Sequence, residues 1–98
     1  DKGWFLNTQY NQKFKGNEGD DVTITFHAKN KDGNGKIKLV IQSDVKGSFQ
    51  GKDFYLTEDW TRYSHTFNLK SKSNNQGVKF WYMTESTEFY LDDLSISK

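Results

Sequence analysis

The sequence predicts an all-β fold, specifically a jelly-roll β-sandwich in which two antiparallel sheets pack face to face. Three observations support this prediction. Gly, Asn, Asp and Ser mark turns about every 8–12 residues. The segments between the turns alternate apolar and polar residues. No amphipathic helix of useful length fits between the turns. Two packed sheets are the simplest way to bury one face of each of about seven short strands.

The composition is typical of one small domain with an aromatic-rich core. The chain has 98 residues, of which 33% are hydrophobic and 16% aromatic, and its mean hydropathy is −0.95. Disordered chains are poor in aromatic residues, so a folded domain is expected. We expect residues 1–98 to form a single monomeric module. With so many rings in so polar a chain, some of them must lie on the surface.

Charge and cysteine content exclude several function classes. Fourteen Lys and Arg residues oppose thirteen Asp and Glu residues, so neither nucleic acid nor an anionic membrane is an expected partner. The chain contains no cysteine, which excludes a disulfide scaffold and a thiolate metal site. No run approaches the ~20 apolar residues that span a bilayer. Because the chain begins at Asp1 rather than Met, we expect it to be a mature protein or an excised fragment, and one module of a longer protein.

The clearest strand is predicted at residues 22–28, where apolar residues at even positions alternate with polar residues. Residues 37–42 continue the pattern, with Val40 on the outward face. The pair Asn34-Gly35 between these segments suits a tight hairpin turn.

Four more strands are predicted at residues 54–57, 60–69, 78–83 and 89–96. The turns between the predicted strands include residues 45–52 and 71–77. The first segment, 3–14, carries four aromatic rings in no clear register. It is interpreted as either two short strands or one strand with a long loop.

The segment 78–83 differs from the other predicted strands in its outward face. Its inward positions are apolar, and the alternation turns Trp81 and Met83 outward beside Lys79. Large apolar side chains on the solvent side of a strand indicate a binding surface.

Three segments of the C-terminal half carry a resemblance to a known family. They read Asp59-Trp-Thr-Arg-Tyr-Ser-His-Thr-Phe67, Val78-Lys-Phe-Trp-Tyr82 and Glu88-Phe-Tyr-Leu-Asp-Asp-Leu-Ser-Ile96. The pattern resembles carbohydrate-binding modules of the 4/9/22 group over about residues 19–98, with a shortened N-terminal part. These modules are galactose-binding-domain-like jelly rolls attached to xylanases and glucanases.

The resemblance implies non-catalytic binding of β-linked plant cell-wall polysaccharide. Xylan is the first expectation and β-glucan the next, and the module would direct an attached glycoside hydrolase such as a xylanase to its substrate. A secreted, cell-surface or periplasmic bacterial location follows from this role. The alternative is a β-sandwich used for protein contact or spacing in a surface protein, because a fold does not fix function.

The resemblance also points to individual residues. Trp81 falls where xylan-binding members place an outward aromatic residue on a groove strand. Met83 replaces a hydrogen-bonding acid, so a carboxylate would have to come from Glu85 or Glu88. Trp60 is expected in the core, because these modules keep it at the start of a buried strand.

A glycan site needs flat rings for the apolar face of a sugar and planar amide or charged groups for its hydroxyls. Gln42 and Lys38 lie outward on a strand that could neighbour Trp81, and Lys79 lies beside it. Trp4 is expected either to stack a second sugar ring or to plug the end of the sandwich. Tyr90 points to the opposite side from Phe89 and Leu91, whose register is buried. It is expected to extend either face of the sandwich.

Cofactors and catalysis are not expected from the residues themselves. Many of the resembling modules bind a structural calcium ion near the chain ends, to which Asp92 or Asp93 could contribute, although no ligand cluster of clear spacing is visible. Glycoside hydrolysis normally needs two carboxylates at a fixed separation across a cleft. The acids of this chain instead occupy turns and strand ends, and no Ser-His-Asp spacing is present.

Overall fold

The computed structural model describes residues 5–31, 33, 35–83 and 88–98. The elements assigned to these residues are all β-strands. No helix suited to crossing a membrane is found among them. The strands are β1 (Phe5–Gly16), β2 (Asp21–Asn30), β3 (Lys36–Gln42), β4 (Gln50–Tyr55), β5 (Thr61–Asn68), β6 (Ser73–Tyr82) and β7 (Phe89–Ser97).

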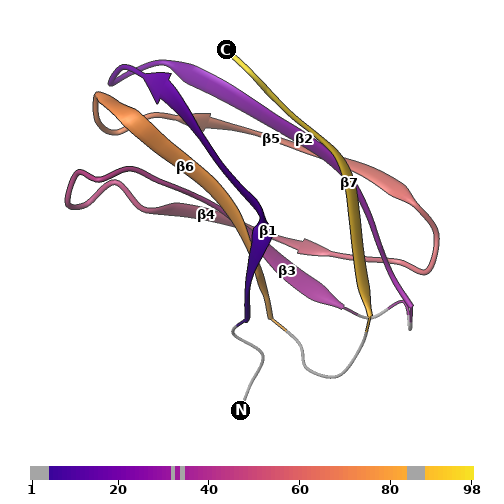
Figure 1. Ribbon diagram of the computed structural model, residues 1–98. Coiled ribbons are helices and arrows are strands. Elements are labelled where there is room, and N and C mark those ends of the chain that lie inside the picture. The colour runs from indigo at the N-terminus through magenta and orange to yellow at the C-terminus, as the bar shows by residue number, and fades with distance from the viewer. Residues whose placement is uncertain (1–4, 32, 34, 84–87) are drawn as a thin grey trace.

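The strands form two antiparallel sheets that pack as a sandwich (Figure 1). The four-stranded sheet has the order β1-β6-β3-β4, and the three-stranded sheet has the order β5-β2-β7. The predicted jelly-roll sandwich is therefore confirmed. The predicted hairpin at Asn34-Gly35 is wrong, because β2 and β3 lie in different sheets and the chain crosses between them there. Asn34 itself lies outside the described residues.

The core between the sheets consists of the inward sets that alternation predicted. Phe26 lies at its centre, with its ring centroid 4.9 Å from that of Phe80, 5.3 Å from that of Phe54 and 5.4 Å from that of Tyr63. Such ring pairs add about 0.5–1.5 kcal/mol each beyond the area they bury. This cluster joins both sheets and shows which faces of β2, β4, β5 and β6 point inward.

Polar segments lengthen two strands beyond their predicted bounds. β6 begins at Ser73, so the turn predicted at 71–77 is wrong over most of its length. Gln76 is buried there, and its amide donates to the carbonyl oxygens of Ser71 at 2.8 Å and Gly16 at 3.4 Å. β4 begins at Gln50, whose amide donates to the carbonyl of Asn68 at 2.9 Å. Hydrogen bonds to neighbouring segments thus allow turn-forming residues to extend a sheet.

β1 is one strand along the edge of the four-stranded sheet rather than two strands or a strand with a long loop. Its pairing with β6 shifts register between Asn7 and Gln12, which is the mark of a bulge or irregularity. Beyond the shift Lys13 pairs with Gly77, so Lys13 lies on the same face of the sheet as Gly77. This register brings β1 alongside the surface on which Trp81 lies.

Candidate ligand-binding site

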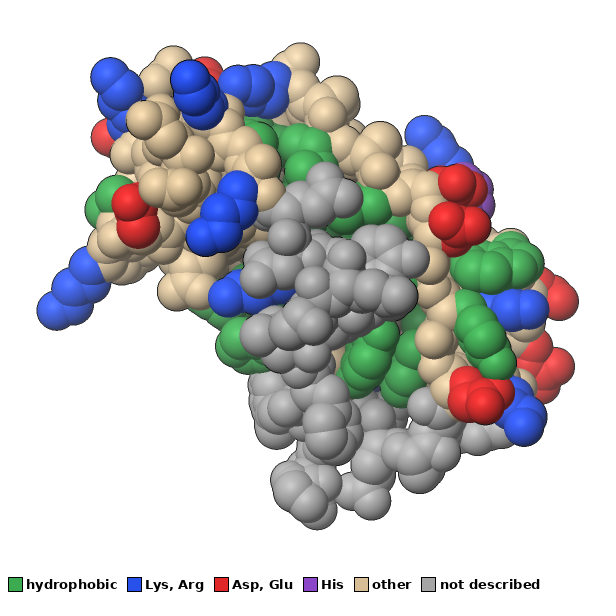
Figure 2. Space-filling model, viewed as in Figure 1, with side chains coloured by type: hydrophobic (Ala, Val, Ile, Leu, Met, Phe, Trp, Pro, Cys, Tyr) green, Lys and Arg blue, Asp and Glu red, His purple; other side chains and the backbone are tan. Residues whose placement is uncertain are grey.

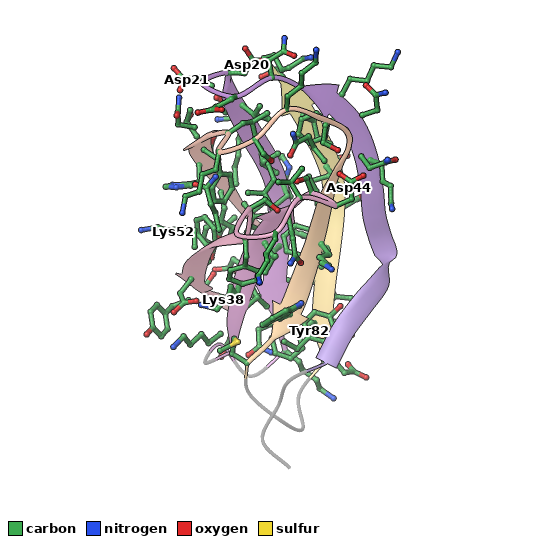
Figure 3. The ribbon with its side chains drawn as sticks, turned by 90° about the vertical axis from the view of Figure 1, so that its left-hand side faces the viewer. Asp20, Asp21, Lys38, Asp44, Lys52 and Tyr82 are labelled. Atoms are coloured by element: carbon green, nitrogen blue, oxygen red, sulfur yellow. The ribbon has the colours of Figure 1, made fainter. Side chains whose placement is uncertain are left out.

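The outer face of the four-stranded sheet carries a row of three paired residues. Lys38 on β3 lies opposite Trp81 on β6 and Asp53 on β4, and residues paired in this way share a face. The Lys38 ammonium is 3.0 Å from Asp53 Oδ1, and Lys36 Nζ is 3.4 Å from Asp53 Oδ2. The outward positions predicted for Trp81 and Lys38 are confirmed. Figure 3 shows this sheet with β1 along its right-hand edge and Lys38 and Asp44 labelled.

Two aromatic rings form a platform on this face. The ring centroids of Phe49 and Trp81 lie 5.5 Å apart, with the ring planes tilted by 41°. Val40 has the outward register predicted for it but is completely buried. Gly51 lies opposite Val40, where an added Cβ would meet Lys38 Cδ at 2.9 Å. The glycine therefore leaves room for the lysine stem to lie flat beside the platform.

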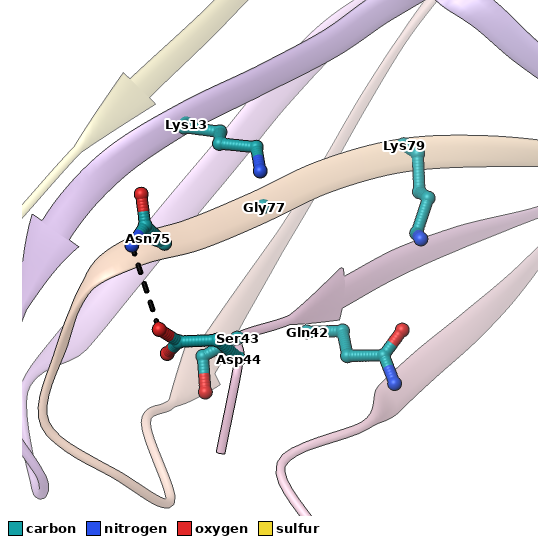
Figure 4. A pocket seen from close by; sticks show the side chains of 7 residues that line it. All are labelled: Lys13, Gln42, Ser43, Asp44, Asn75, Gly77 and Lys79. Carbon is teal, nitrogen blue, oxygen red and sulfur yellow. Dashed lines mark hydrogen bonds between the residues drawn. The ribbon is translucent and has the colours of Figure 1, made fainter. Parts of the chain in front are cut away.

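A cavity of about 190 Å³ opens on the same face (Figure 4). Its lining residues come from β1, from β6 and from the end of β3, and they are Lys13, Gln42, Ser43, Asp44, Asn75, Gly77 and Lys79. In Figure 4 Lys13 and Lys79 lie on either side of Gly77, on neighbouring strands. Gln42 and Lys79 were predicted as site residues. Lys13, Asp44 and Asn75 were not, because only the sheet order brings them together.

Hydrogen bonds hold Asp44 in place at the end of the cavity. Ser73 Oγ donates to Asp44 Oδ1 at 2.6 Å, and Asn75 Nδ2 lies 3.5 Å from Asp44 Oδ2. The bonds from Ser73 and Asn75 hold the pKa of the Asp44 carboxyl below its usual value. The carboxylate is therefore ionised at neutral pH and acts as a fixed acceptor.

The outer face of the four-stranded sheet carries a net positive charge. Among its charged residues are the four lysines Lys13, Lys36, Lys38 and Lys79 and the two aspartates Asp44 and Asp53. Burial would raise the pKa of Asp53, but hydrogen bonds from Lys38 and Lys36 outweigh it and hold that pKa below its ordinary value. These six residues together contribute a net charge of about +2.

The remaining predicted site residues are dispersed. Trp4 and Glu85 lie outside the described residues. Met83 is partly exposed just after β6, where its amide donates to the carbonyl of Lys36 at 2.7 Å. Tyr90 belongs to β7 in the other sheet, so it does not join Trp81.

The predicted core position of Trp60 is wrong, because its side chain is 48% exposed. Thr61 pairs with Ala28 in the β2–β5 register, so the residue before it lies level with Lys29. Lys29 belongs to the outward set of β2, which alternates with the buried residues. Trp60 is therefore on the outer side of the three-stranded sheet.

Asp92 and Asp93 do not assemble a calcium site with other described residues. Calcium takes about six to eight oxygen ligands. Asp93 Oδ2 instead lies 3.3 Å from His27 Nδ1. No group of three or more His, Asp or Glu side chains suited to a metal ion occurs in the described part of the chain. The donor set therefore does not fit the structural calcium that the resemblance suggested.

Comparison with known proteins finds similarity in structure only. No protein-family model matches the chain, and no curated protein matches its sequence. A solved structure described as "CBM4 structure and function" aligns with a TM-score of 0.69 and 24% identity, over 89% of this chain and 58% of that one. "Family 16 Carbohydrate Binding Module-2" aligns with a TM-score of 0.67 and 18% identity, over 90% of this chain and 67% of that one.

A third similar structure combines a binding module with a catalytic domain. It is the CBM22-1–GH10 portion of Clostridium thermocellum xylanase 10B in complex with xylohexaose. It aligns with a TM-score of 0.63 and 13% identity, over 98% of this chain and 26% of that one. The chain thus spans little more than half of the CBM4 structure and about a quarter of the xylanase fragment. At these identities the likeness shows the fold, which is the one found in carbohydrate-binding modules, and the 4/9/22 resemblance is consistent with it.

Proposed function

We propose that the outer face of the four-stranded sheet binds a β-linked plant cell-wall polysaccharide, with xylan as the first choice and β-glucan as the next. The observation that carries the proposal is the Phe49–Trp81 platform, which continues on the same face into a polar cavity. Similar folds in carbohydrate-binding modules support non-catalytic polysaccharide binding. The site, the choice of glycan and the link to an enzyme are our inference.

The chemistry of the face suits a chain of sugars. The apolar face of one ring stacks on the Phe49–Trp81 platform, while hydroxyl groups of the next units bond with Gln42 and Lys79 in the cavity. Gly77, in the floor of the cavity, lies four residues before Trp81 on β6, which corresponds to about 13 Å at 3.3 Å per residue. A ligand that spans both features must therefore be an oligosaccharide or a longer chain.

The two carboxylates of this face are suited to binding rather than hydrolysis. Glycosidases need one carboxylic acid whose pKa is raised so that it can donate a proton. Asp44 and Asp53 both have pKa values below the ordinary range, because each accepts hydrogen bonds that stabilise its ionised form. Neither therefore serves as a general acid at neutral pH, which supports a role in holding the glycan.

We further propose that the module keeps an attached glycoside hydrolase, such as a xylanase, on its substrate. Tethering raises the local concentration of the enzyme at the polysaccharide without any new contact. The xylanase fragment that this fold resembles supports such an arrangement. Because cell-wall polysaccharide lies outside the bacterium, the proposal places the protein at the cell surface, in the periplasm or among secreted proteins.

Affinity electrophoresis in gels containing soluble xylan, mixed-linkage β-glucan or dextran tests the binding site. The wild-type protein is expected to be retarded by xylan, less by β-glucan, and not by α-linked dextran. Trp81→Ala should migrate as if no glycan were present, and Trp81→Phe should keep part of the retardation because a flat ring remains. Thermal unfolding of each variant provides the control for folding. Unchanged retardation of Trp81→Ala would remove Trp81 from the site, and no retardation by any glycan would favour a protein-contact module.

The tethering role is tested on the polypeptide that contains the module. Deletion of residues 1–98 should lower xylan hydrolysis several-fold on insoluble xylan and leave hydrolysis of soluble xylo-oligosaccharides unchanged. An equal loss on both substrates would indicate a structural role in the enzyme instead.

A further inference from the structure

The opposite side of the sandwich carries a second exposed aromatic pair. Trp60 is 48% exposed and Tyr90 is 40% exposed, and their ring centroids lie 6.5 Å apart. Lys29 projects between them from β2, with its ammonium 5.2 Å from the Trp60 ring centroid and 5.3 Å from the Tyr90 centroid. We call Lys29, Trp60 and Tyr90 the Trp60 cluster. The right-hand flank of Figure 2 shows hydrophobic, basic, acidic and histidine side chains gathered on this side of the molecule.

A cavity of about 280 Å³ adjoins the Trp60 cluster. Its lining residues are His27, Trp60, Asp92 and Asp93. His27 lies opposite Asp92 in the β2–β7 pairing. The cavity therefore combines an aromatic ring, which suits the apolar face of a sugar, with carboxylates, which accept hydrogen bonds from its hydroxyl groups.

A bulge in β7 places the two carboxylates together. The register of β2 and β7 shifts between Thr25 and His27, and Asp93 has a φ of 55° within this irregularity. A non-glycine residue in the left-handed region is strained, and such strain is concentrated at functional sites. The bulge allows Asp93 Oδ2 to lie 3.3 Å from His27 Nδ1, while Asp92 Oδ1 accepts the amide of Asp93 at 2.8 Å. One carboxylate oxygen of each aspartate remains for a ligand.

The charges around the cavity indicate which ligands it accepts. Asp92 and Asp93 carry two negative charges, and Glu88 adds a third through its 2.6 Å bond to the Tyr90 hydroxyl. Lys29 and Arg62, which pairs with His27 across β2 and β5, supply two positive charges. The net charge of about −1, with both carboxylates in the lining itself, disfavours a uronate or another anionic ligand. The position that a foreign cation would take between the rings is already held by Lys29. A neutral ligand with adjacent hydroxyl donors fits the remaining chemistry best.

We propose that this cavity is a second glycan-binding site, which takes one neutral sugar unit with its apolar face on Trp60 and its hydroxyls donating to Asp92 and Asp93. The site lies on the three-stranded sheet and shares no residue with the platform on the four-stranded sheet. Two sites on opposite faces would let one module bridge neighbouring polysaccharide chains or engage a side branch, and binding would gain from bivalency.

Nuclear magnetic resonance of the indole N–H groups tests the two sites separately, because the chain contains only three tryptophans. Trp81→Ala is titrated with xylohexaose, cellohexaose, galactose, glucose and the matching galacturonate and glucuronate. We expect the Trp60 resonance to shift and saturate with at least one neutral sugar, and to shift several-fold less with its uronate. The double variant Asp92→Asn, Asp93→Asn should weaken that binding at least threefold, and Thr66→Ala, on the outer face of β5, should not.

Two outcomes would overturn the second site. The first is an unshifted Trp60 resonance with every sugar, whatever happens at Trp81 in the wild-type protein. The second is a Trp60 resonance that moves with a lysine-rich peptide and with no sugar, which would make the cavity a cation-binding contact. A wild-type titration in which Trp60 shifts and Trp81 does not would instead contradict the function proposed for the four-stranded sheet while supporting this site.

Discussion

Phe49 and Trp81 reach the same platform from different kinds of structure. Trp81 is fixed by the β6 ladder, whereas Phe49 comes from the loop that precedes β4, and their ring centroids lie 5.5 Å apart. The loop is braced from within, because Ser43 N donates to Ser48 Oγ at 2.9 Å and Ser48 N donates to the carbonyl of Val45 at 3.2 Å. Half of the platform therefore depends on how well this loop is held.

Phe49→Ala should weaken glycan binding without unfolding the protein. Removing the ring takes away stacking area and a side contact that holds Trp81 in place, and we expect the dissociation constant for xylohexaose to rise about three- to tenfold, or about 0.7–1.4 kcal/mol. Because Phe49 is 39% exposed, the change in thermal unfolding should be small. Isothermal titration calorimetry measures the effect. Val45→Ala, an exposed apolar position in the same loop, is the matched control, and an equal loss in both variants would assign the effect to the loop rather than the ring.

The lysines of the cavity should make binding sensitive to acidic side groups on the glycan. Lys13 and Lys79 present their ammonium groups on the positively charged face, so xylan substituted with glucuronic acid is expected to bind more tightly than unsubstituted xylan at low salt. The preference should fall as sodium chloride is raised to 0.5 M, since exposed charges are screened. The double variant Lys13→Gln, Lys79→Gln should remove the preference and lower binding to unsubstituted xylan by a smaller factor, because the glutamine amide at position 79 still bonds sugar hydroxyls. A preference that survives the double substitution would place the recognition of acid groups elsewhere.

Alternation predicted the inward and outward faces of the strands well, because burial imposes a period of two wherever one face of a sheet is covered. Trp81 was placed correctly on this basis. Trp60 was not, because it precedes the first residue of β5 and its position depends on its alignment with Lys29 across the sheet. The family pattern around Trp60 suggested a buried residue, and only the strand pairing shows the opposite.

Residues that depend on sheet order could not be predicted from a single sequence. Lys13 and Asp44 line one cavity because β1 and β3 are both neighbours of β6, although the two residues are far apart in the chain. Ser73 and Gln76 were assigned to a turn because their residue types favour turns. In the structure, hydrogen bonds to Asp44, Ser71 and Gly16 allow that segment to continue as a strand.

The free energy of unfolding should decrease as the pH is lowered from 7.5 to 5, because of His65. Burial first, and then the positive charge of Lys52, lower the pKa of His65 from its ordinary value of about 6.5. As the pH falls through 6.5 the unfolded state takes up its proton before the folded state does, so the free energy of unfolding decreases until the pH reaches the folded pKa. Urea unfolding at half-unit pH steps measures this. His65→Gln, which cannot titrate, should flatten the profile over this window, and an unchanged slope would assign the dependence to other groups.

The crossover between the two sheets should depend on Asn30, which is completely buried at the end of β2. Its side-chain oxygen accepts the amide of Gly35 at 2.8 Å, and its side-chain nitrogen donates to the carbonyl of Glu88 at 3.1 Å. Asn30→Ala leaves a buried amide and a carbonyl without these partners, which should cost about 2–3 kcal/mol in the free energy of unfolding.

For a domain of this size that loss corresponds to a fall of roughly 8–20 °C in melting temperature. Urea denaturation and thermal unfolding measure it, and Asn74→Ala, at an exposed asparagine of β6, is expected to stay within about 0.5 kcal/mol of the wild type. The chain passes from β2 in one sheet to β3 in the other immediately after Asn30. A loss no larger than that of the Asn74 variant would mean that the crossover is held by the backbone bonds from Asn30 N to Thr57 O and from Gly33 N to Asn30 O, which the substitution leaves intact.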